Sequence, residues 1–167
     1  MRNPEFVKAA FSAIATRYVA TNHVLSMGVD LLWRQRVVQL VSEWKPKRLL
    51  DLATGTGDLA LAILRAMPEI RLTGSDFCQP MLDVAAERGL TNLVCADAMN
   101  LPFPSASYDA VTVAFGLRNM ASYPDALKEM GRMLRPGGHL LILDFSLPEN
   151  LLKRPYRFYL HLSLIHI

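Results

Sequence analysis

Short apolar runs alternate with helical patterns through the middle of this 167-residue chain. Such continuous runs are typical of strands that are buried on both faces of a parallel sheet. We expect five strands, at residues 48–53, 71–75, 93–96, 108–115 and 139–145. We expect helices at residues 4–18, 29–44, 58–67, 80–88 and 123–134, and a Pro-Gly-Gly run at 136–138 should end the last of them. This alternation predicts an α/β fold with a doubly wound, mostly parallel sheet.

Composition excludes several other classes of protein. Hydrophobic residues make up 51% of the chain and charged residues 20%, which excludes disorder. No apolar run reaches the roughly 18 residues that a membrane span requires, and the first residues contain no apolar signal segment. Two cysteines, Cys78 and Cys95, are too few for a disulfide scaffold, and no group of His, Cys and Asp has the spacing of metal ligands. We therefore expect a cytoplasmic protein without a metal site.

The net charge of +3 is unevenly distributed along the chain. Residues 1–48 have a balance of +5, residues 49–147 of −4, and residues 148–167 of +2. The acidic centre argues against a nucleic-acid groove, so no nucleic-acid partner is expected. The basic ends would suit an anionic membrane surface, although ordinary solvated surface explains them as well.

A glycine-rich turn joins the first expected strand of the sheet to the helix that follows. Gly55, Gly57 and Ala60 form the pattern G-x-G-x-x-A. Glycines permit a tight turn and let a ligand approach the main chain closely. The pattern fits NAD as well as other ligands, and a tight turn without any ligand remains an alternative.

Acidic residues follow the next two expected strands. Asp76 lies 21 residues after Gly55, where a carboxylate can accept both ribose hydroxyls of a nucleotide. Asp97 follows the third strand, where it can accept from an adenine amino group. Each acid alone could be a helix cap or a turn residue. Together with the glycine turn they favour an adenosine-containing ligand, with NAD and S-adenosylmethionine both open.

Three segments resemble the motifs of class I methyltransferases. They are LDLATGTGD at 50–58, NLPFPSASYDAVTVAF at 100–115 and LRPGGHLLIL at 134–143. The resemblance implies a Rossmann-like fold and S-adenosylmethionine as the methyl donor. By position it also implies a set of cofactor-binding residues: Asp51, Gly55, Thr56, Gly57, Asp76, Asp97, Ala98 and Ala114. The family commonly has Ser at position 114, so a contact from Ala114 must come from the backbone.

A narrower resemblance is to the ubiquinone/menaquinone C-methyltransferases. It rests on LPFP at 101–104, FGLRN at 115–119, DFS at 144–146 and, nearer the start, Phe11, Ser12, Tyr18, Asn22, Ser26, Met27, Gly28, Leu32, Trp33 and Arg34. That family methylates a ring carbon of a polyprenyl hydroquinone, either a demethylmenaquinol or a methoxy-benzoquinol. The resemblance thus implies a polyprenyl quinol substrate, peripheral contact with the inner face of a membrane, and a homo-oligomer or a quinone-biosynthesis complex as further partners.

The same resemblance implies catalytic residues. We expect Arg118 to stabilise a phenolate oxygen, because a guanidinium stays charged, and Asn119 to orient the other ring oxygen. Tyr18 and His23 are candidates for proton transfer. His23 stands where the family usually has Asp, and so does Val19. A structural salt bridge for Arg118 and a surface position for His23 are the alternatives.

The motifs divide the chain into four segments. We expect a helical substrate-covering segment at 1–46, the S-adenosylmethionine-binding core at 47–147, the start of a C-terminal part at 148–161, and a foreign tail or frame error at 162–167. A complete class I sheet has seven strands and we count five, so we expect a sheet truncated after the fifth strand. A methyltransferase of another small molecule, a non-catalytic S-adenosylmethionine-binding module and a dehydrogenase are the competing interpretations.

Overall fold

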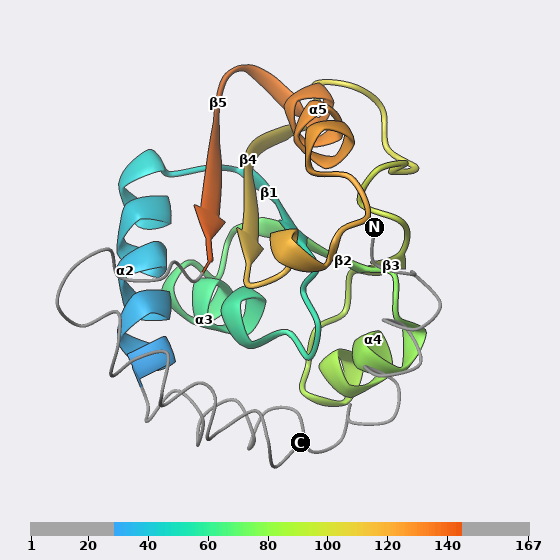
Figure 1. Ribbon diagram of the computed structural model, residues 1–167. Coiled ribbons are helices and arrows are strands. Elements are labelled where there is room, and N and C mark those ends of the chain that lie inside the picture. The colour runs from blue at the N-terminus through green and yellow to red at the C-terminus, as the bar shows by residue number, and fades with distance from the viewer. Residues whose placement is uncertain (1–28, 145–167) are drawn as a thin grey trace, which may run out of the picture.

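The computed structural model of the protein describes residues 29–144. Its core is a sheet of five strands in the order β3-β2-β1-β4-β5, and every neighbouring pair is parallel (Figure 1). The strands are β1 (Arg48–Leu52), β2 (Arg71–Asp76), β3 (Leu93–Cys95), β4 (Tyr108–Ala114) and β5 (Leu134–Leu143). The predicted doubly wound parallel sheet is confirmed, with the strand order of Rossmann-type folds.

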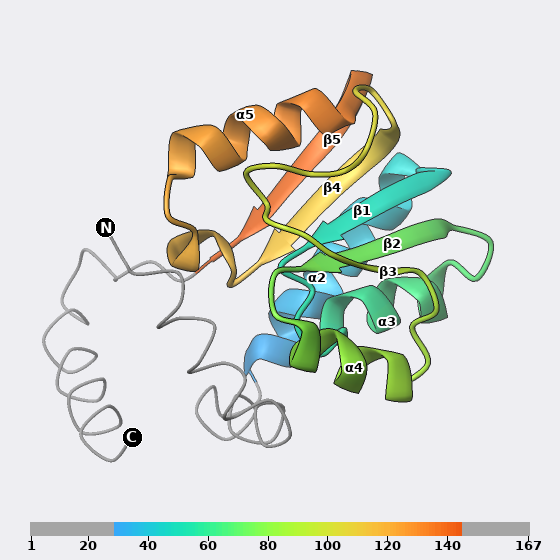
Figure 2. The same cartoon turned by 90° about the vertical axis from the view of Figure 1, so that its right-hand side faces the viewer.

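Helices cover both faces of the sheet. They are α2 (Val29–Trp44), α3 (Asp58–Ala66), α4 (Gln79–Glu87) and α5 (Tyr123–Met133). Figure 2 shows α5 on one side of the sheet and α2 and α3 on the other. Successive residues of β1 alternate between these layers: Leu49 packs in the cluster that contains α2 and α3, and Leu50 and Leu52 pack with α5. All three leucines are almost completely buried, as expected for a strand inside a doubly covered sheet.

The starts of α4 and α5 have residues that favour the first turn of a helix. Ser122 precedes α5, and its side chain accepts a hydrogen bond from the backbone N–H of Asp125. Proline stands in the first turn of both α4 and α5, where its missing N–H costs no intrahelical hydrogen bond. The predicted helix 29–44 is confirmed in full, and the other described helices begin and end within about two residues of the prediction.

The boundary between α5 and β5 differs from the prediction. We expected the Pro-Gly-Gly run to separate the helix from a strand that starts at residue 139. The structure pairs Leu134 with Tyr108 already, directly after the helix, and pairing then resumes between His139 and Ala110. The Pro-Gly-Gly run therefore lies in an irregularity within β5, because proline cannot donate to the ladder at that point. A short 3-10 helix, η1 (Leu117–Asn119), was not predicted.

Other predictions fall on residues that the structure does not describe. The helix at 4–18, the segment 148–161 and the tail 162–167 lie outside the described residues, so the division of the chain stays a prediction.

β5 forms one edge of the sheet, where Leu140 and Ile142 are 37% and 41% exposed. Within residues 29–144, no helix is long and apolar enough to cross a membrane.

Candidate functional site

All five strands point the same way, so their carboxyl ends lie together along one side of the sheet (Figure 2). We call this side the carboxyl edge of the sheet, as distinct from its outer strands β3 and β5. In doubly wound sheets, ligands bind at this edge. The strand order brings Asp97, Asp76, the glycine turn, Arg118 and Asp144 to this edge in succession, after β3, β2, β1, β4 and β5 respectively. Most of the residues predicted from the sequence are therefore neighbours in the fold.

The glycine turn between β1 and α3 depends on left-handed backbone. Gly55 has φ +55 and Gly57 has φ +81, a region that residues with side chains seldom adopt. A Cβ atom on Gly57 would lie 2.4 Å from a methyl of Leu90, so close packing also requires glycine there. The Gly57 N–H donates to the Thr54 carbonyl at 2.9 Å, which closes the turn. Thr56, between the glycines, is buried.

Asp76, at the end of β2, is bonded to this turn. The Gly55 N–H donates to one carboxylate oxygen of Asp76, and the Cys78 N–H donates to the other, both at 2.9 Å. Burial raises the pKa of Asp76, and the hydrogen bonds from backbone N–H groups act against this rise. Each carboxylate oxygen has a second lone pair. A ligand hydroxyl can therefore add to these bonds without displacing the turn.

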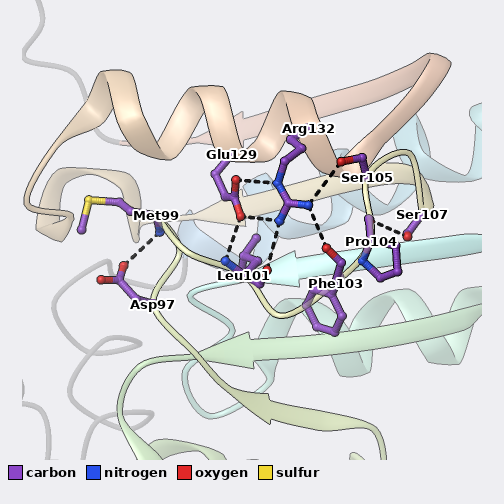
Figure 3. A network of polar contacts seen from close by, with 9 residues as sticks. All are labelled: Asp97, Met99, Leu101, Phe103, Pro104, Ser105, Ser107, Glu129 and Arg132. Carbon is purple, nitrogen blue, oxygen red and sulfur yellow. Dashed lines mark hydrogen bonds and ion pairs between the residues drawn. The ribbon is translucent and has the colours of Figure 1, made fainter.

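Asp97 and Ala98 lie in the long connection between β3 and β4. The Asp97 side chain is exposed, and one of its oxygens accepts from the Met99 N–H at 2.9 Å (Figure 3). The Asp97 carbonyl accepts from the Asn100 N–H at 2.9 Å, so the residue also closes a turn. Both roles predicted as alternatives, turn residue and accessible acceptor, are thus compatible in this position.

Arg132 of α5 holds the rest of this connection against the sheet. Its guanidinium donates to the carbonyls of Leu101 and Phe103 at 3.0 and 2.8 Å, and to the Ser105 hydroxyl at 3.3 Å (Figure 3). It also pairs with Glu129 at 2.6 Å, and Glu129 accepts from the Leu101 N–H at 2.8 Å. The hydrogen bond from Arg132 lowers the pKa of Glu129, so the pair is charged at neutral pH. The position of the LPFP segment is therefore fixed by one helix.

Asp51 lies below the glycine turn rather than at its surface. It is 2% exposed, and its two oxygens accept from the hydroxyls of Thr54 and Thr112 at 2.7 and 2.6 Å. Burial raises the pKa of Asp51 to about 6, and the nearby Asp76 adds to the rise. This geometry makes Asp51 a support for Thr54, the residue that opens the turn. Direct contact between Asp51 and a cofactor stays a prediction.

Sequence analysis missed an ion-pair cluster around Asp58, the first residue of α3. Arg88 pairs with Asp58 at 2.7 Å and also donates to the Thr56 carbonyl at 2.7 Å. Arg34 of α2 is 8% exposed and lies 3.5 Å from the other oxygen of Asp58. The arginines come from segments far apart in the chain, and although Arg34 belongs to a motif of the family resemblance, nothing in the sequence shows that both would pair with Asp58. Their contacts connect α2 and α4 to the glycine turn.

The chain after β4 places Arg118 and Asn119 in η1. Phe115 turns the chain there with φ +58, and Gly116 packs so closely that a Cβ atom would lie 2.3 Å from the Cβ of Ala53. Arg118 pairs with Asp144 at 3.0 Å, and its guanidinium lies 5.9 Å from the centre of the Phe115 ring. The salt bridge considered as an alternative for Arg118 is therefore present.

The remaining predicted site residues have different outcomes. Ala114 is the half-buried last residue of β4, beside Leu143 of β5. Tyr18 and His23 lie outside the described residues. Among residues 29–144, no three His, Cys, Asp or Glu side chains gather as metal ligands would. The acceptors at this edge, two carboxylates beside a glycine turn, suit a ligand with hydroxyl and amino donors, as the adenosine part of S-adenosylmethionine has.

Comparison with known proteins gives a consistent result. The model of the ubiE/COQ5 methyltransferase family matches residues 1–166. A Thermus thermophilus protein named demethylmenaquinone methyltransferase is 52% identical over 145 residues, which cover 84% of this chain and 66% of that protein. A Geotalea daltonii protein named ubiquinone/menaquinone biosynthesis C-methyltransferase UbiE is 40% identical over 164 residues, covering 93% of this chain and 70% of that protein.

A solved structure shows the same fold. The crystal structure of an Aquifex aeolicus SAM-dependent methyltransferase has a TM-score of 0.59 and 19% identity, over 75% of this chain and 77% of that chain. This likeness confirms the expected Rossmann-like fold. The chain spans 66% and 62% of the lengths of two curated relatives, from Thermus thermophilus and Deinococcus radiodurans.

Proposed function

Because this chain belongs to the ubiE/COQ5 methyltransferase family, we propose that it carries the S-adenosylmethionine-binding part of an enzyme that methylates a ring carbon of a polyprenyl hydroquinone. The names of its relatives support a demethylmenaquinol or a benzoquinol precursor of ubiquinone as the substrate. The observation that carries the proposal is the sheet edge itself. It brings a glycine turn and two carboxylates, which suit the cofactor, beside a charged arginine, which suits a phenolate.

Different residues would hold different parts of the cofactor. Asp76 would accept hydrogen bonds from the ribose hydroxyls, and Asp97 would accept one from the adenine amino group. The turn at Gly55 and Gly57 would let the methionine part approach the backbone of Thr56. S-adenosylmethionine supplies a methyl group on a positively charged sulfur. This ligand has no pyrophosphate, which agrees with a core of net negative charge.

The reaction requires few chemical groups from the protein. Bound S-adenosylmethionine would supply the methyl group to a ring carbon of the quinol and keep the electron pair of the broken sulfur–carbon bond, and the ring carbon would then give up its proton. The protein holds the reacting atoms in line, which is mainly positioning. Arg118 stabilises the neighbouring phenolate, and Asp144 fixes the direction of its guanidinium. Asn119 orients the second ring oxygen, and Tyr18 and His23 are candidates to accept the proton.

The cofactor assignment is tested by calorimetric titration of the chain with S-adenosylmethionine, with NADH as control. We expect binding of S-adenosylmethionine alone, and loss of it in Asp76→Ala. The folded state of that variant is checked by circular dichroism, because Asp76 also holds the glycine turn. Binding of NADH instead of S-adenosylmethionine by the folded chain would contradict the assignment.

The catalytic assignment is tested by Arg118→Ala. Loss of a donor to a developing oxyanion typically lowers turnover by about 10²- to 10³-fold. We expect such a loss of kcat for a demethylmenaquinol, with the affinity for S-adenosylmethionine nearly unchanged. If affinity and turnover fell equally, Arg118 would act on the fold of the site and not on the substrate.

We also propose that the protein works in the cytoplasm at the inner face of a membrane, because its substrate would carry a long isoprenoid chain. The candidate contact is the mixture of cations and aromatics at residues 153–158, which lies outside the described residues. Cosedimentation with anionic vesicles tests this contact. Binding should weaken when Lys153, Arg154 and Arg157 are replaced by Gln.

A further inference from the structure

A cavity opens at the amino ends of the strands, on the opposite side of the sheet from the proposed cofactor site. Its volume is about 600 Å³, and it lies where β1 and β2 begin. One wall is the connection from α2 to β1, and the other is the connection from α3 to β2. The Arg71 N–H donates to the Lys47 carbonyl at 3.0 Å, so hydrogen bonding joins the two walls.

The cavity is surrounded by positive charge. Lys45, Lys47, Arg48 and Arg71 line it, and Glu69 is the one acidic residue in the lining. Arg48 and Arg71 are direct register partners on neighbouring strands, and the Arg48 guanidinium lies 5.4 Å from the centre of the Tyr108 ring. A cleft lined by charges of one sign attracts ions of the opposite sign.

No carboxylate of residues 29–144 forms an ion pair with any of these four cations. The contrast with other arginines is clear: the described ion pairs all use Arg34, Arg88, Arg118, Arg132 or Arg135. Among the described acids, Asp109 is the one that is hydrogen-bonded to the backbone of this cationic segment. One of its oxygens accepts from the backbone N–H groups of Lys47 and Arg48, and the other pairs with Arg135. Both carboxylate oxygens of Asp109 therefore already have partners other than the side chains of the four cations.

The lining between the charges is apolar. Pro46 and Ile70 are buried, and Met67 and Pro68 complete this part of the wall. A simple inorganic anion would leave this surface uncovered. A ligand that has an anionic head and a short apolar part would use both.

We propose that this cavity binds the phosphate group of an amphiphilic ligand, through Lys45, Lys47, Arg48 and Arg71. Cations of this kind are general binders of phosphate oxygens. The phosphate can come from a soluble phosphate ester or from a lipid headgroup. The site is separate from the proposed methyl-transfer site, so either assignment can fail without the other.

The test compares two variants that each remove two positive charges. Lys45→Gln/Arg71→Gln removes two positive charges from the cavity lining, and because both side chains are exposed it should not weaken the fold. Arg36→Gln/Arg65→Gln is the control, because these arginines are exposed and lie outside the cavity lining. Circular dichroism and S-adenosylmethionine affinity should be the same in both variants.

The probes are octyl phosphate and inorganic phosphate, measured by calorimetry, and vesicles of phosphatidylcholine with or without phosphatidylglycerol, measured by cosedimentation. A soluble ligand is indicated if octyl phosphate binds more tightly than inorganic phosphate and the cavity variant weakens it by roughly tenfold, about the value of one charged hydrogen bond. A lipid headgroup is indicated if only anionic vesicles bind and only the cavity variant loses them. The proposal is overturned if neither probe binds, or if both variants lose binding equally.

Discussion

The Arg88 guanidinium donates a 2.7 Å hydrogen bond to the carbonyl of Thr56, which stands 32 residues earlier in the chain. The same guanidinium pairs with Asp58 at 2.7 Å, on the other side of Gly57. Two residues after Arg88, Leu90 packs against Gly57 itself. The end of α4 thus holds the glycine turn from outside, while Asp76 holds it from the sheet.

We predict that Arg88→Ala lowers the affinity for S-adenosylmethionine by roughly tenfold, the worth of about one charge-assisted hydrogen bond. Without this contact, the glycine turn would become ordered only when the ligand binds. The free energy needed for that ordering lowers the affinity for the ligand. Arg88→Lys should restore part of the loss, because it keeps the charge beside Asp58. The measurement is calorimetric titration, with Arg65→Ala as an exposed control. Unchanged affinity in Arg88→Ala would show that the turn is ordered without this contact.

A second prediction concerns Gly57→Ala. The residue has φ +81, and a new Cβ would lie 2.4 Å from Leu90. Left-handed backbone and overpacking together should lower the free energy of unfolding by about 2 to 4 kcal/mol. Gly131→Ala is the matched control, because Gly131 is an exposed residue of α5 with open space around its Cβ position. That change should stabilise the protein by about 0.5 to 1 kcal/mol. Urea denaturation measures both, and equal effects would refute the packing argument.

A third prediction follows from the buried carboxyl of Asp51. Burial raises its pKa to about 6 from an ordinary value of 3.8. The Asp51 carboxyl of the folded protein therefore stays protonated over a range of pH in which the same carboxyl of the unfolded chain is ionised. The stability that Asp51 contributes is fully present below about pH 4 and is lost as the pH rises through 6. Between about pH 4 and pH 7 this loss amounts to roughly 2 to 3 kcal/mol.

The measurement is the free energy of unfolding of the wild type and Asp51→Asn as a function of pH. Asparagine does not titrate, and it can still bond to the hydroxyls of Thr54 and Thr112. The variant should gain stability relative to the wild type as the pH rises across this window. Parallel curves for the two proteins would mean that Asp51 does not titrate in this range.

The elements of the fold could be predicted because their signals are local. A buried strand such as 48–52 appears in the sequence as an apolar run, and α2 appears as leucines and valines that recur at helical spacing. The start of β5 could not be found in this way. Leu134 joins the sheet by pairing with Tyr108, which is a tertiary contact, and the Pro-Gly-Gly run after it indicates a loop on local grounds.

The candidate site divides in the same manner. Gly55, Asp76 and Asp97 could be predicted because each follows a strand at a fixed place in the motif. Arg34 and Arg88 could not, since their role depends on which helices meet at Asp58. The support that Arg132 gives to the LPFP segment spans about thirty residues and likewise has no local sign.

The last prediction separates orientation from charge at the proposed catalytic arginine. One carboxylate oxygen of Asp144 pairs with the Arg118 guanidinium at 3.0 Å. The other oxygen accepts from the backbone N–H of Arg118, with a nitrogen–oxygen distance of 3.4 Å. Asp144→Asn keeps the size and one acceptor oxygen but removes the charge that fixes the guanidinium. We expect kcat for a demethylmenaquinol to fall by roughly tenfold, less than in Arg118→Ala, because the arginine is still present but points less consistently at the phenolate.

The affinity for S-adenosylmethionine should stay within about twofold in Asp144→Asn, because Asp144 lies after β5, while the glycine turn, Asp76 and Asp97 lie at the ends of β1 to β3. The double variant Asp144→Asn/Arg118→Ala should then be no slower than Arg118→Ala alone, since Asp144 acts only through the arginine. If instead the two losses multiplied, Asp144 would contribute to the reaction independently, and its pairing with Arg118 would not be the reason for its effect.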